Sequence, residues 1–198
     1  MKFLSIVGAR PEFIQAMPVS QALRLSHDEV LVHTCQHYDY QMSQRFFDEL
    51  AIPTPRYNLA VGAGSHAQQT AEILLRLEPI LLAEKPDAVI VRGDTNSTLG
   101  AALVTSKLQI PLIHIEAGER SYNRAMPEEI NRLLVDAIAD CHFCVSQKAV
   151  TQLAQEGKTH TVYWVGDVML DALRQVLPMA AKRSALLTRL GVRPEQYG

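Results

Sequence analysis

The chain has 198 residues, of which 47% are hydrophobic and 20% charged, with a formal net charge of -2. This composition supports one substantial core and excludes a strongly basic face for nucleic acid or for an anionic membrane surface. A short N-terminal apolar run and the lack of roughly 18 consecutive apolar residues favour a cytoplasmic protein with a small-molecule partner.

Apolar runs alternate with helical patterns along the chain. Strands are expected near residues 2–8, 29–35, 87–92, 111–116, 141–145 and 162–166. Helices are expected near residues 12–24, 40–50, 65–84, 96–107, 127–139, 147–156 and 168–190. Strands that alternate with helices form parallel sheets, and near-continuous apolar strands indicate a sheet covered on both faces. We therefore expect an α/β fold, a Rossmann-like doubly wound parallel sheet.

The end of the chain indicates a continuation. The helix through Leu187 and Leu190 is followed by Gly-Val-Arg-Pro-Glu-Gln-Tyr-Gly, which is typical of the approach to a further strand. We assign residues 1–175 to the Rossmann-like domain. Residues 176–198 are expected to form a helical connection towards a second domain outside this chain.

The three cysteines are Cys35, Cys141 and Cys144. An odd set without a secretion signal favours reduced thiols over a disulfide framework. Cys141 and Cys144 have C-x-x-C spacing, but a zinc site needs a second ligand pair, and their surroundings are typical of a buried strand. No metal site is expected.

Three polar segments follow predicted strands: Gly8–Glu12, Arg92–Asn96 and Glu116–Gly118. In an open parallel sheet, a ligand binds outside the carboxyl ends of the strands, near the point where the strand order reverses. The three segments should therefore meet at one rim, which would carry an arginine and two carboxylates.

The first of these segments has two interpretations. Pro11 suits the first turn of a helix, whose free N–H groups can face a phosphate beside Arg10. A plain strand-to-helix turn with a solvated arginine explains the same residues. The pattern is not G-x-G-x-x-G, so no dinucleotide cofactor is expected.

The acidic residues also have alternative explanations. Asp94 with Thr95 can cap the following helix. Glu116 directly follows a strand that should be buried, where a carboxylate binds a ligand, bonds to the backbone or costs free energy. Glu128 and Arg132 share a helix face, so they either form a surface salt bridge or add a third carboxylate to the rim.

Six segments of the chain are recognisable together, in order and spacing. They are Val-Gly-Ala-Arg-Pro-Glu (7–12), Gln-His-Tyr-Asp (36–39), Arg-Gly-Asp-Thr-Asn-Ser-Thr (92–98), His-Ile-Glu-Ala-Gly-Glu-Arg-Ser (114–121), Met-Pro-Glu-Glu-Ile-Asn-Arg (126–132) and Val-Gly-Asp-Val-Met-Leu-Asp-Ala (165–172). The set resembles the bacterial and archaeal non-hydrolysing UDP-N-acetylglucosamine (UDP-GlcNAc) 2-epimerases. The resemblance implies a GT-B-type fold with the active site between two Rossmann-like halves. This chain would be the N-terminal half, and the second half would be the nucleotide-binding domain. The resemblance further implies a homodimer.

The resemblance also implies site residues. The family's catalytic carboxylates fall on Asp94, Glu116 and Glu128, and its substrate-contacting arginines fall on Arg10 and Arg132. Gln36 and His37 match part of its regulatory substrate site. The sequence departs from the family at Tyr38-Asp39 and at Gln15, where a lysine is frequent.

The implied reaction interconverts UDP-GlcNAc and UDP-ManNAc without a cofactor. The C2 proton is not acidic, so the anomeric C–O bond must break first or together with its loss, giving UDP and 2-acetamidoglucal. UDP then adds back, with a proton delivered to the opposite face of C2. The carboxylates would divide the proton transfers and the stabilisation of positive charge at C1, and Arg10 would help to hold the diphosphate. Because clustered carboxylates repel, at least one should have a raised pKa.

Three other functions stay open. An epimerase of the same family would act on another UDP-sugar, such as a 2,3-diacetamido uronic acid. A GT-B glycosyltransferase would need an acceptor and would not exchange the C2 proton. A non-enzymatic receiver-like module needs an acidic pair after the first strand, where this chain has the basic Arg10.

Overall fold

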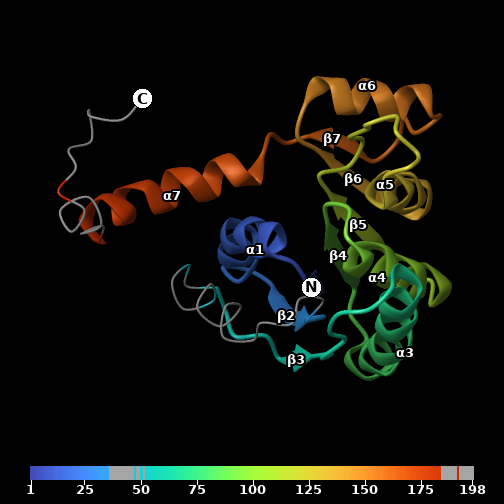
Figure 1. The fold of residues 1–198 in the computed structure, drawn as a ribbon, viewed down its shortest axis with the longest axis horizontal. Coiled ribbons are helices and arrows are strands. Elements are labelled where there is room, and N and C mark those ends of the chain that lie inside the picture. Colours follow the sequence, from blue (N-terminus) through green and yellow to red (C-terminus); the bar gives the residue numbers. More distant parts are fainter. Residues whose placement is uncertain (36–46, 48–49, 51, 184–190, 192–198) are drawn as a thin grey trace.

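The computed structural model describes residues 1–35, 47, 50, 52–183 and 191, and its described part contains one parallel sheet (Figure 1). The strands are β1 (Lys2–Val7), β2 (Asp28–His33), β3 (Tyr57–Asn58), β4 (Ala88–Arg92), β5 (Leu112–Ile115), β6 (Cys141–Cys144) and β7 (Val162–Trp164). They are arranged in the order β3-β2-β1-β4-β5-β6-β7. All six predicted strands form, and the predicted Rossmann-like parallel sheet is confirmed.

The helices lie on both faces of the sheet. They are α1 (Arg10–Leu23), α3 (His66–Glu84), α4 (Asn96–Lys107), α5 (Pro127–Ile138), α6 (Gln147–Gln155) and α7 (Val168–Arg183). Figure 1 shows α3, α4 and α5 side by side on one face and α1 with α7 on the opposite face. The predicted helix at 40–50 falls largely outside the described residues, as does the predicted continuation of the last helix to residue 190.

Apolar side chains fill both interfaces between sheet and helices. Leu4, Val89 and Val91 pack with Leu77 of α3 on one face, while Val7 packs with Phe13 of α1 on the other. Strands buried on both faces explain the near-continuous apolar runs of the sequence. Among the described residues, no helix combines the length and the apolarity that a membrane crossing requires.

Three smaller features of the structure bear on the predictions. The C-x-x-C pair lies on β6 as expected, with Cys144 buried. The short strand β3 was not predicted. The boundary that we placed after residue 175 falls inside α7, and the assignment of a second domain stays a prediction.

Candidate active site

The rim of the sheet carries the predicted segments. The strand order reverses between β1 and β4, which are neighbours in the sheet although β2 and β3 separate them in the sequence. Asp94 follows β4, Glu116 follows β5, and Arg10 begins α1 directly after β1. Since all strands are parallel, these residues lie at the same carboxyl edge, where ligands bind in open α/β sheets.

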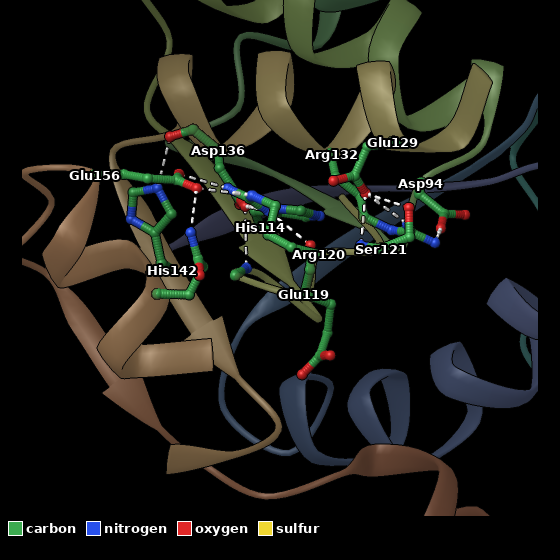
Figure 2. A network of polar contacts seen from close by, with 12 residues as sticks. Asp94, His114, Glu119, Arg120, Ser121, Glu129, Arg132, Asp136, His142 and Glu156 are labelled. Carbon is green, nitrogen blue, oxygen red and sulfur yellow. Dashed lines mark hydrogen bonds and ion pairs between the residues drawn. The ribbon is translucent and has the colours of Figure 1, made fainter. Parts of the chain in front are cut away.

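Arg132 on α5 holds the Asp94 side chain. Its Nη2 donates to Asp94 Oδ2 at 2.5 Å, and its Nη1 donates to Glu129 Oε2 at 2.9 Å (Figure 2). The neighbouring Asn131 donates through Nδ2 to the Asp94 carbonyl oxygen at 2.8 Å. The salt bridge considered between Glu128 and Arg132 is therefore wrong, because the guanidinium group turns to Glu129 and Asp94 instead.

Glu129 is a buried carboxylate that the sequence analysis missed. It accepts hydrogen bonds from the backbone N–H groups of Ser121 and Tyr122, both at 2.9 Å, and from Ser121 Oγ at 3.0 Å. Burial disfavours its ionised form, but these donors and Arg132 outweigh burial and lower the pKa of Glu129 to about 2. Glu129 thus fixes the loop before α5 to the helix that carries Arg132.

Glu116 lies at a strained position of the backbone. Its φ angle is +73°, a left-handed conformation that costs a residue other than glycine on the order of 1 to 3 kcal/mol. Its N–H group and that of Ala117 both donate to the Phe143 carbonyl oxygen, at 3.0 and 3.1 Å. These hydrogen bonds to β6 hold Glu116 in the left-handed conformation. Residues in strained conformations of this kind cluster at functional sites.

The Glu116 side chain is half-buried and poorly compensated. Gln15 Nε2 donates to Glu116 Oε2 at 2.5 Å. Burial raises the pKa of Glu116, and the negative charges of Asp94 and Asp167 raise it further, while the Gln15 hydrogen bond and His114 lower it. The predicted raised pKa is confirmed, but its largest cause is burial rather than repulsion between carboxylates.

Glu128 and Arg10 complete the predicted set at the same edge. Glu128 is half-buried in the first turn of α5, and within the described residues its carboxylate has neither a hydrogen-bond nor an ion-pair partner. Arg10 is exposed at the first position of α1. Gln36 and His37 lie outside the described residues.

The turn after β1 is occupied by the chain's own carboxylate. The buried Glu12 accepts hydrogen bonds from the N–H groups of Gly8 and Ala9, at 2.5 and 3.0 Å, and from Thr95 Oγ1 at 2.6 Å. A Cβ atom on Gly8 would lie 2.0 Å from Ser97 Oγ, so only glycine allows the turn after β1 to approach the first turn of α4 this closely. Glu12 thus binds the N–H groups of Gly8 and Ala9, and the expectation that free N–H groups in the first turn of α1 face a phosphate stays a prediction.

The N-cap residue of α4 decides whether Asp94 caps this helix, as the sequence analysis considered. The N-cap of α4 is Thr95, whose Oγ1 accepts hydrogen bonds from the N–H groups of Ser97 and Thr98 at 3.1 and 3.3 Å. Asp94 itself does not cap the helix, because its carboxylate bonds to Arg132. Among the described residues, no group of three or more His, Cys, Asp or Glu side chains is arranged to hold a metal ion.

The arrangement is suited to acid–base chemistry. One edge of the sheet brings a carboxylate with a raised pKa close to a second carboxylate that pairs with an arginine. Two carboxyl groups whose surroundings differ in this way can take different proton-transfer roles.

Comparison with known proteins shows what the chain is similar to. Residues 21–197 match the family model "UDP-N-acetylglucosamine 2-epimerase". The chain is 50% identical to a UDP-N-acetylglucosamine 2-epimerase homolog of Methanococcus maripaludis, over 100% of this chain and 56% of the relative. It is 49% identical to the UDP-2,3-diacetamido-2,3-dideoxy-D-glucuronate 2-epimerase of Pseudomonas aeruginosa, over 87% of this chain and 50% of the relative.

Among solved structures, the UDP-GlcNAc 2-epimerase of Methanocaldococcus jannaschii in complex with UDP-GlcNAc and UDP superimposes with a TM-score of 0.91 and 43% sequence identity. The superposition covers 96% of this chain and 53% of that structure. The chain spans about half the length of the curated relatives it matches.

Proposed function

Because the chain belongs to the UDP-N-acetylglucosamine 2-epimerase family, we propose that it forms the N-terminal half of an enzyme that interconverts UDP-GlcNAc and UDP-ManNAc by inversion at C2. The full-length enzyme is this chain together with the second half that its relatives carry. The observation that carries the proposal is Glu116, a strained carboxylate with a raised pKa beside Asp94.

The chemistry follows from the weak acidity of the C2 proton. The anomeric C–O bond breaks, UDP leaves with the bonding electrons, and the C2 proton is lost to a base, which gives 2-acetamidoglucal. In the return step UDP adds to C1, and a proton reaches the opposite face of C2. The two faces need an acid and a base, and positive charge at C1 needs a carboxylate nearby.

We assign proton transfer at C2 to Glu116, because its surroundings favour the protonated form that can donate. Asp94, oriented by Arg132, and Glu128, which has no partner in the described part of the chain, take the second proton transfer and the stabilisation of charge at C1. Arg10 contacts the diphosphate as it leaves. Arg132 serves as the second substrate-contacting arginine.

A second substrate deserves a direct test, because the chain is 49% identical to an enzyme that epimerises UDP-2,3-diacetamido-2,3-dideoxy-D-glucuronate. The full-length enzyme is incubated separately with that sugar nucleotide and with UDP-GlcNAc, and the products are separated chromatographically. Formation of UDP-ManNAc supports the proposal. Conversion of the uronate alone moves the activity to the second substrate, and conversion of neither contradicts both.

The residue assignments have their own test. The variants Asp94→Asn, Glu116→Gln and Glu128→Gln are compared in kcat, with Asp140→Asn as the matched control. Asp140 is an exposed carboxylate at the opposite end of β5, where it accepts a hydrogen bond from the Leu112 N–H group. Loss of turnover in the three variants but not in the control is expected. Unchanged turnover in all three would contradict the assignments.

The family likeness also leads us to propose a homodimer for the full-length enzyme. Sedimentation velocity at micromolar concentration tests this directly. A dimeric mass supports it, and a monomeric mass contradicts it.

A further inference from the structure

The two flanks of Glu116 bond to the same buried carboxylate. Asp136 on α5 is 1% exposed. Its Oδ1 lies 2.6 Å from Nδ1 of His114, two residues before Glu116, and its Oδ2 accepts a hydrogen bond from the N–H group of Gly118, two residues after, at 3.0 Å. A single side chain therefore spans the strained turn.

The same contacts reach the turn that carries Asp94. The second ring nitrogen of His114, Nε2, lies 2.8 Å from the Gly93 carbonyl oxygen. A carbonyl oxygen only accepts a hydrogen bond, so Nε2 of His114 is the donor to Gly93. His114 consequently joins the end of β5 to the residue that precedes Asp94.

Asp136 is anchored from the other side by an arginine. Arg120 Nη1 donates to Asp136 Oδ2 at 2.7 Å, and its Nε and Nη2 donate to the two carboxylate oxygens of Glu156 at 2.9 and 2.7 Å (Figure 2). Burial opposes ionisation of Asp136, but His114 and Arg120 outweigh burial and lower its pKa. Alternating charges thus run from the end of α6 to the catalytic edge of the sheet.

The segment after Glu116 has little freedom to move by itself. Gly118 has a φ angle of +83°, and a Cβ atom there would lie 2.6 Å from the Ala149 carbonyl oxygen. With Gly118 packed against α6 and His114 held in β5, the direction of the Glu116 side chain depends on the hydrogen bonds at its two flanks.

We propose that Asp136 is a positioning residue for the reaction, which through His114 and Gly118 holds Glu116 in its left-handed conformation and in register with Asp94. This inference rests on the proposed function of Glu116. Asp136 lies behind the turn and contacts neither the carboxylate of Glu116 nor that of Asp94. Its effect is therefore on the geometry of the reacting groups rather than on binding of the nucleotide.

Substitutions at Asp136 separate geometry from charge. In Asp136→Asn the amide oxygen can still accept from the Gly118 N–H group while the amide nitrogen donates to Nδ1 of His114, so both flanks stay bonded. In Asp136→Ala both flanks are released. Asp140→Asn, which removes a carboxylate at the far end of β5, is the matched control.

The test measures kcat, KM for UDP-GlcNAc and the thermal midpoint of each variant of the full-length enzyme. Asp136→Ala should lower kcat about 100-fold, the loss typical of a small misplacement of reacting groups. Asp136→Asn should lower it about tenfold, because a neutral hydrogen bond replaces a charge-assisted one. In both, KM should stay within about twofold of its original value, as expected when only the reactive geometry changes.

Each outcome decides the inference. Equal kcat values in Asp136→Ala and Asp140→Asn, or a raised KM with unchanged kcat, would overturn it. If Asp136→Ala gives no cooperative unfolding transition, Asp136→Asn decides alone, since a kcat equal to that of the control overturns the proposal and a lowered kcat at an unchanged midpoint supports it. An unsubstituted enzyme that converts neither sugar nucleotide would overturn the proposed function as well.

Discussion

Glu116 and Glu129 lie at the same edge of one sheet, yet their surroundings push their pKa values in opposite directions. Glu129 receives hydrogen bonds from Ser121, Tyr122 and Arg132, and its pKa falls to about 2. Glu116 receives one hydrogen bond within the described residues, from Gln15, and its pKa rises. The difference separates a carboxylate that is held in its ionised form from one whose surroundings favour the protonated form.

The strongest test of this contrast is Glu116→Gln. The amide keeps the shape of the side chain but cannot transfer a proton, so turnover in the full-length enzyme should fall about 10³-fold, within the range that general acid–base catalysis contributes. Stability should rise, by about 1 kcal/mol, because a desolvated charge is removed. Steady-state kinetics and thermal melting measure the two effects. Retained turnover would mean that Glu116 is not a reacting group.

Glu129→Gln should have the opposite profile. It leaves Arg132 and the loop N–H groups without their carboxylate, and breaking a buried pair costs about 3 kcal/mol. Urea unfolding of the full-length enzyme should show an earlier midpoint. Glu128→Gln is the control, because Glu128 has no partner within the described residues, and its substitution should change stability by no more than about 0.5 kcal/mol. Equal urea midpoints for Glu129→Gln and Glu128→Gln would contradict the stabilising role of Glu129.

The pH dependence of stability sharpens the comparison further. For Glu129, a lowered folded-state pKa means that the carboxylate stabilises the folded state above about pH 4.5. This contribution to the free energy of unfolding is lost as the pH falls towards 2. For Glu116, a raised folded-state pKa means that the protonated side chain stabilises the folded state below about pH 4.5. This contribution to the free energy of unfolding is lost as the pH rises through the folded-state pKa. Hence Glu129→Gln should destabilise less in acid, and Glu116→Gln should stabilise more at neutral pH. Unfolding midpoints between pH 3 and 8, read at intervals of about one pH unit, decide whether the two differences move in these directions.

The smallest expected effect comes from Gln15. An ammonium group in Gln15→Lys would sit beside Glu116 and lower its pKa, which moves the Glu116-dependent limb of the kcat profile to lower pH. Gln15→Met has a similar volume, removes the hydrogen bond that lowers the pKa, and should move the same limb to higher pH. If the two variants move this limb in the same direction, Gln15 acts on Glu116 through packing rather than through charge.

The fold could be predicted largely from the sequence. Periodic apolar runs and the turns between them gave six strands of the correct type because burial on both faces leaves a continuous apolar signal. The strand β3, at Tyr57–Asn58, has two residues and is too short to show a period. It is defined by its pairing with β2, not by its own composition.

The site could be predicted only in part. Residues that follow strands were found because parallel strands bring their carboxyl ends together. Glu12, Glu129 and Asp136 were missed as site-forming groups, since their partners are set by the tertiary fold, such as the contact between Glu12 and Thr95. An acidic residue in the first turn of α1 was the one local signal for Glu12.

Arg132 illustrates the limit of spacing rules. Glu128 stands at the i,i+4 distance that favours pairing on a helix, yet the guanidinium group bonds to Glu129 at i,i+3 and to Asp94 across the rim. A planar group with several donors satisfies two carboxylates at once, and its choice of partners depends on the position of α5 beside the turn that follows β4. The spacing of residues along one helix does not predict this tertiary arrangement.

The central claim is that Glu116 exchanges the C2 proton of a UDP-linked N-acetylhexosamine. Its most direct test is incubation of the full-length enzyme with UDP-GlcNAc in deuterated water, with the C2 position followed by NMR in the unsubstituted enzyme and in Glu116→Gln. The account predicts deuterium at C2 together with a manno-configured product in the first, and neither in the second. Incorporation at an equal rate in Glu116→Gln, or no incorporation by the unsubstituted enzyme, would contradict it.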